Sequence, residues 1–124
     1  MTDTQESRFR DKVGDPPELV VPSQVLTDDD FRRREDYAAC ACAIQNLMLS
    51  LWSEGVTSKW TTGSITRDPM TYEHLGLTPP GEEGHEEGDQ KILGFIWIGY
   101  PREDHADTPK PGRLSPEEVT RHVP

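Results

Sequence analysis

The sequence predicts an α+β fold in which one long central helix packs on a small sheet. The apolar residues of the 124-residue chain are concentrated in two segments, 37–60 and 92–100. The first segment has helical spacing, whereas the second is a short continuous apolar run. Because only 32% of the residues are hydrophobic, we expect a second subunit or another segment to complete the core.

The residues before the helix are predicted to contain little regular structure. Residues 1–16 are polar and show no periodicity, which is typical of an irregular lead-in. The stretch 18–26 is rich in β-branched residues, but Pro22 interrupts it and removes a backbone donor, so an edge strand is expected there. Residues 27–30 then form a turn whose carboxylates favour the start of a helix.

The long helix is predicted to begin at Asp30 or Glu35 and to end at about Ser53. Its apolar stripe consists of Tyr37, Ala41, Ile44, Met48 and Leu51, and it is widened by Ala38, Cys42, Leu47 and Leu49. A helix that is apolar on several sides is expected at an oligomer interface or in the middle of a larger structure. Gly55 is expected to cap its C-terminus.

Several short elements are predicted after the helix. Residues 56–60 are expected to be extended, and a second helix starts where Asp68 serves as cap and Pro69 occupies the first helical position. The run 91–98 (KILGFIWI) is typical of a strand covered on both faces. Near the C-terminus, residues 115–118 (SPEE) have the pattern of a capping box that opens a short helical turn.

The charge of the chain limits its partners. Its 23 acidic and 13 basic residues give a net charge of -10. This disfavours nucleic acid, which needs clustered Lys and Arg, and it disfavours an anionic membrane surface. No run has the apolar length of a membrane-spanning helix, and the N-terminus lacks the apolar core of a signal peptide, so we expect a cytoplasmic protein.

The sequence predicts no metal site. Cys40 and Cys42 point to different faces of one helix, which disfavours a disulfide between them, and we expect small, semi-buried thiols. The four histidines are scattered without the spacing of metal ligands. His85 lies in an acidic loop that could bind a hard cation loosely, but a solvated loop is the favoured interpretation.

The turn that follows residues 56–60 is the best candidate for a binding site. Its residues are Trp60, Thr61, Thr62 and Gly63. Gly63 allows close approach of the backbone to a planar ligand, and neighbouring N–H groups can donate hydrogen bonds to it. The alternative is an ordinary tight turn, which the local sequence alone favours. Lys110 and Arg113 could hold a phosphate, although such isolated residues are more often solvated charges.

Six segments occur in a distinctive order along the chain. They are 35–39 (EDYAA), 43–49 (AIQNLML), 52–55 (WSEG), 59–63 (KWTTG), 92–101 (ILGFIWIGYP) and 113–119 (RLSPEEV). In combination they resemble the nitroreductase family of FMN-dependent oxidoreductases. The resemblance implies that residues 17–124 form the C-terminal portion of a nitroreductase-like domain whose N-terminal part is absent.

The resemblance also implies a homodimer with FMN at the subunit interface and the long helix in the dimer core. The implied cofactor-binding residues are Trp60, Thr61, Thr62, Gly63, Lys110 and Arg113. Backbone N–H groups of Thr62 and Gly63 would lie near flavin N5 and O4, and Trp60 and Thr61 would shape the wall beside the isoalloxazine. The two cationic residues would contribute to binding the FMN phosphate.

Two functions remain open from the sequence. The resemblance implies hydride transfer from NAD(P)H through FMN to a nitro, quinone or similar small electron acceptor, with no catalytic side chain. Such an enzyme would work as a homodimer or would pair with the missing N-terminal half. The alternative is a catalytically inactive fragment that acts as a dimerisation or interaction module.

Overall fold

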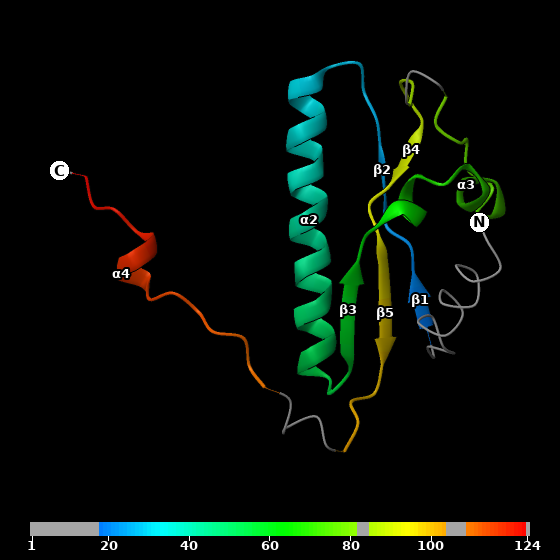
Figure 1. Ribbon diagram of the computed structural model, residues 1–124. Helices are drawn as coiled ribbons and strands as arrows, with labels where there is room; N and C mark the ends of the chain where they lie inside the picture. The colour runs from blue at the N-terminus through cyan, green and yellow to red at the C-terminus, as the bar shows by residue number, and fades with distance from the viewer. Residues whose placement is uncertain (1–17, 82–84, 104–108, 124) are drawn as a thin grey trace.

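The computed structural model describes residues 18–81, 85–103 and 109–123, so the predicted lead-in 1–16 lies outside the described residues. The elements are β1 (Glu18–Val20), β2 (Ser23–Val25), α2 (Asp30–Ser53), β3 (Thr57–Thr61), η1 (Ser64–Arg67), α3 (Pro69–His74), β4 (Gln90–Ile92), β5 (Phe95–Gly99) and α4 (Pro116–Val119). Figure 1 shows α2 lying alongside β3, with α3 on the other side of the strands and the segment carrying α4 extending away. The structure therefore confirms an α+β arrangement with a long helix on small sheets.

The described strands form two antiparallel sheets. One has the order β1-β5-β3, and the other pairs β2 with β4. Pro22 separates β1 from β2, and its carbonyl accepts a hydrogen bond of 2.9 Å from the backbone N–H of Leu93. As the sequence predicts, the proline interrupts the stretch 18–26, and β1 lies at an edge of its sheet.

The prediction of one continuous strand over residues 91–98 is wrong. The run is divided into β4 and β5 by Leu93 and Gly94. Gly94 has a φ of +147°, and a Cβ atom at this position would lie 2.3 Å from Nε1 of Trp60. Only glycine suits this backbone conformation and this close approach. At this point the chain passes from one sheet to the other, while the side chains of the surrounding residues 92–96 remain buried.

The ends of α2 agree with the predicted bounds. Asp29 is the N-cap, and its carboxylate accepts a hydrogen bond of 2.9 Å from the backbone N–H of Phe31. At the other end, Gly55 has a φ of +77° and donates a backbone hydrogen bond of 3.0 Å to Trp52. This is the glycine cap that the sequence predicts.

Only one side of α2 packs on the sheet. The predicted stripe residues that are buried or half-buried are Ala41, Ile44, Met48 and Leu51. Tyr37, the remaining member of the stripe, is 46% exposed. Away from the sheet, exposed side chains form what we call the outer face of α2, namely Phe31, Ala38, Cys42, Leu49 and Trp52. The predicted burial on several sides is thus not achieved within the described part of one chain.

The small core is built around Tyr72, whose side chain is fully buried. Tyr72 packs with Ile92 and Phe95. Its hydroxyl accepts a hydrogen bond of 3.0 Å from the backbone N–H of Ile92 and donates one of 3.2 Å to the carbonyl of Thr66. Asp68 positions this tyrosine, because it caps the start of α3 as predicted.

Candidate functional site

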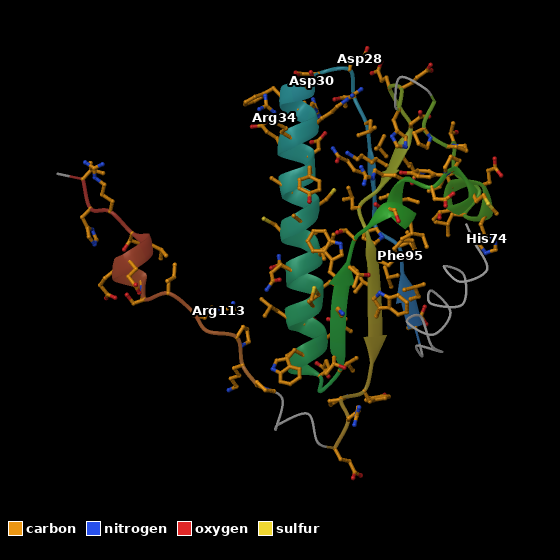
Figure 2. All side chains as sticks on the ribbon, in the orientation of Figure 1. Asp28, Asp30, Arg34, His74, Phe95 and Arg113 are labelled. Atoms are coloured by element: carbon orange, nitrogen blue, oxygen red, sulfur yellow. The ribbon has the colours of Figure 1, made fainter. Side chains whose placement is uncertain are left out.

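The segment called the turn 60–63 consists of Trp60 and Thr61, which are the last two residues of β3, and of Thr62 and Gly63, which follow it beside the start of β5. Thr61 is paired there with Phe95, which Figure 2 labels. Because β3 is an edge strand of the described sheet, the chain that follows it is not enclosed by another strand. The fold therefore places this turn at an accessible margin of the sheet.

Trp60 and Thr61 fix the base of the turn. The indole Nε1 of Trp60 donates a hydrogen bond of 3.1 Å to the carbonyl of Leu93. The hydroxyl of Thr61 accepts one of 2.8 Å from the indole of Trp97 and donates one of 3.3 Å to the carbonyl of Phe95. Both side chains are half-buried, so their polar atoms hold the turn on β5.

Thr62 and Gly63 form the exposed tip of the turn. Gly63 has a φ of +151°, and no atom lies within 4 Å of the position that a Cβ would take. Its carbonyl accepts hydrogen bonds from the backbone N–H and the hydroxyl of Thr66, at 3.1 and 2.7 Å. Neither N–H of the tip has an acceptor among the described residues. The arrangement suits a planar ligand that carries hydrogen-bond acceptors.

Lys110 and Arg113 lie far along the chain from this turn, between β5 and α4. Both residues are exposed. Figure 2 shows Arg113 on the segment that extends away from the sheet. Within one chain, the structure therefore brings the four turn residues together and leaves the two cationic residues apart from them.

A cavity of about 530 Å³ beside α2 was not predicted from the sequence. Its lining residues are Gln24, Leu26, Arg33, Arg34, Tyr37, His85 and Lys91. They come from β2, the residue that follows it, α2, the loop before β4 and β4 itself, so no local pattern joins them. The adjacent pair Arg33 and Arg34, in an acidic stretch, is the one signal that could have pointed to it. The turn 60–63 does not line this cavity.

The pKa of His85 is lowered by its surroundings in this cavity. Burial lowers the pKa of His85 below its ordinary value of 6.5. The carboxylate of Asp89 acts in the opposite direction, whereas Lys91 and Arg33 lower this pKa further. The imidazole is therefore held toward its neutral form by burial and by neighbouring cations.

Within residues 18–81, 85–103 and 109–123 there is no group of three or more His, Cys, Asp or Glu side chains that could hold a metal ion. Over the same residues, no helix is long and apolar enough to cross a membrane. Cys40 and Cys42 are free thiols, half-buried and exposed respectively.

Three comparisons place the chain among known proteins. A model of the nitroreductase family matches residues 4–102, a range that includes part of the predicted lead-in. A Bacillus subtilis (strain 168) protein provisionally named NAD(P)H nitroreductase YfhC is 26% identical over 103 residues, which are 83% of this chain and 48% of the relative. The crystal structure of a nitroreductase-like family protein from Bacillus cereus superimposes with a TM-score of 0.76 at 25% identity, covering 99% of this chain and 62% of the other. The chain thus spans about half the length of the curated relative.

Proposed function

The chain belongs to the nitroreductase family, and we propose that it functions as a cytoplasmic FMN-dependent oxidoreductase. The enzyme would transfer hydride from NAD(P)H to a nitro, quinone or similar small electron acceptor. The observation that carries this proposal is the tip of the turn, where two backbone N–H groups have no acceptor among the described residues beside a glycine with open space. Bound FMN would supply the redox chemistry.

The residues of the turn bind and orient the flavin in this proposal. Thr62 and Gly63 donate backbone hydrogen bonds to acceptor atoms of the ring, and fixed donors of this kind need no reorganisation. Trp60 and Thr61 hold these donors in place through their hydrogen bonds to Leu93, Trp97 and Phe95 and form the adjoining wall. No side chain of the turn has to gain or lose a proton.

A second subunit would complete the site, because the tip of the turn is open in one chain. We propose that the outer face of α2 forms the subunit interface, since Leu49 and Trp52 are each 56% exposed there. The partner is a second copy, or a chain that carries the N-terminal part of the family domain. Lys110 and Arg113, on the extending segment, would then bind the FMN phosphate in the partner's site.

The flavin proposal is tested with the full chain and its Gly63→Ala variant. Purified protein mixed with FMN should show the flavin absorbance band after desalting, and Gly63→Ala should lose it, because a side chain is strained at this φ and faces the ring. Gly88→Ala is the matched control, since Gly88 has a φ of +83° and open space around it. Equal retention of FMN by both variants would refute the role of the turn.

The phosphate contacts are tested separately by comparing FMN with riboflavin, which lacks the phosphate. Lys110→Gln and Arg113→Gln should weaken FMN binding about tenfold each and leave riboflavin binding unchanged. Arg121→Gln removes the same charge from the same exposed segment and should change neither affinity. A parallel loss of riboflavin binding would show that these residues act on something other than the phosphate.

The alternative function is a non-catalytic dimerisation or interaction module, which the outer face of α2 favours by itself. Leu49→Glu places a charge in that face and should convert a dimer to monomers in light scattering. Met70→Glu, at an exposed position in α3 on the other side of the strands from α2, is the control and should leave the dimer intact. A chain that dimerises through this face and binds no FMN would favour the module over the enzyme.

A further inference from the structure

The cavity beside α2 carries positive charge in a chain whose net charge is -10. Three of its lining residues are the cations Arg33, Arg34 and Lys91, and none is a carboxylate. Acidic residues outnumber basic ones by 23 to 13 along the chain, so the charge of this lining is opposite in sign to the net charge of the chain. A local surplus of cations in an acidic protein attracts anionic ligands specifically to this cavity.

The cations differ in how firmly they are held. The Nε of Arg33 donates a hydrogen bond to the carbonyl of Thr27, and its guanidinium lies 4.0 Å from the carboxylate of Asp30. Arg34 and Lys91 are exposed and form no ion pair with a described residue. The lining thus combines one anchored cation with two whose charges are available to a ligand.

His85 contributes a buried nitrogen that lacks a partner. Its Nε2 has no hydrogen-bond partner among the described residues, although it is shielded from solvent. The imidazole packs against the ring of Tyr72, with ring centroids 5.2 Å apart, and Tyr72 is itself fixed by its hydrogen bonds. Buried polar atoms are rarely left unpaired, so a ligand that displaces the atoms covering this nitrogen would supply its missing partner.

The size and the apolar part of the lining indicate more than a simple ion. A volume of about 530 Å³ is typical of a small-molecule site and exceeds what one phosphate group fills. Leu26 is buried and Tyr37 is half exposed, so an aliphatic surface and an aromatic ring stand beside the cations. A planar body could lie along this wall while an anionic group reaches the cations.

We infer that this cavity binds a small phosphate ester, with its phosphate near Lys91, Arg34 and His85 and its planar body against Tyr37. A phosphate ester carries nearly two negative charges at neutral pH, which matches the two available cations, Arg34 and Lys91, better than a single carboxylate does. Arginine and lysine are both common phosphate ligands. This site is separate from the turn 60–63, and its test contains no flavin.

The first experiment is an NMR titration of the full, flavin-free chain with inorganic phosphate and with phenyl phosphate at constant ionic strength. The imidazole signals of His85 should shift and saturate, and those of the exposed His122 should stay in place. Phenyl phosphate should bind about tenfold more tightly, because its ring packs on Tyr37. Absence of a saturable shift at His85, or equal affinity for the two probes, would overturn the assignment.

The second experiment uses matched lysine variants. Lys91→Gln should weaken phenyl phosphate binding about tenfold, since it removes one charge-assisted hydrogen bond. Lys59→Gln removes the same charge from an exposed position on β3 and should have no effect. Equal losses in both variants would show attraction to general charge and would refute a built site. Circular dichroism of each variant verifies that the fold is retained.

Discussion

The replacement of Gly94 by alanine tests how the turn 60–63 is joined to the core. A Cβ at this position would lie 2.3 Å from Nε1 of Trp60 and 2.6 Å from the carbonyl oxygen of Thr61. The φ of +147° adds a backbone strain of about 1 to 3 kcal/mol for any other residue. Forced overpacking costs about another 1 to 3 kcal/mol. We therefore expect Gly94→Ala to lower the free energy of unfolding by about 2 to 6 kcal/mol.

Two further glycine variants separate these contributions in urea unfolding followed by circular dichroism. Gly76→Ala has a positive φ of 68° but open space, so it should cost only about 1 to 2 kcal/mol. Gly112→Ala has neither feature and should stay within about 0.5 kcal/mol of the parent. The reasoning is refuted if Gly94→Ala costs no more than Gly76→Ala.

A double-mutant cycle identifies the clashing partner even if the Gly94→Ala chain is barely stable. In a Trp60→Leu background the indole is gone, so the overpacking part of the Gly94→Ala penalty should be reduced to the contact with the carbonyl oxygen of Thr61. The backbone part should remain. An unchanged penalty in that background would mean that the indole is not what excludes a side chain at position 94.

Three further changes have defined outcomes. Tyr72→Phe leaves the backbone N–H of Ile92 without its 3.0 Å partner and should cost about 1 to 3 kcal/mol in urea unfolding, whereas Tyr100→Phe, at a largely exposed position, should be neutral. Because the folded state lowers the pKa of His85, the unfolded chain binds its proton more readily, and stability should fall as the pH drops through 6.5. His85→Gln should flatten this decline between about pH 8 and about pH 5 in phosphate-free buffer, and an unchanged slope would contradict it. A backbone hydrogen bond from the N-cap of α4 lowers the pKa of Glu118, so α4 should lose NMR helix shifts as the pH falls through that pKa, and Glu118→Gln should abolish this dependence.

Local signals were sufficient to predict the three α-helices, although not the short 3-10 helix η1. The bounds of α2 follow from apolar spacing and from Gly55, whose glycine cap needs no tertiary information. The start of α3 follows equally from Asp68 and Pro69, because a capping carboxylate and a proline suit the first turn. These features depend on neighbours in sequence, which is why pattern analysis finds them.

Features that depend on distant residues could not be predicted in the same way. The break at Gly94 depends on the indole of Trp60, which lies against it from another strand. The cavity joins Arg33 to His85 and Lys91, and only the pairing of β2 with β4 brings these parts of the chain together. For the turn 60–63, the sequence predicted the position, and the roles of its residues in holding a flavin stay a prediction.

The three tryptophans of this chain stand at two different places, and this gives them two separate uses as optical reporters. Trp52 is on the outer face of α2, so its emission should respond to subunit association. Trp60 and Trp97 are hydrogen-bonded at the base of the turn, where a bound flavin would quench them by energy transfer. A variant that keeps only Trp52 would therefore report subunit association by its fluorescence. A variant that keeps only Trp60 or Trp97 would report flavin binding, so the two events could be followed independently.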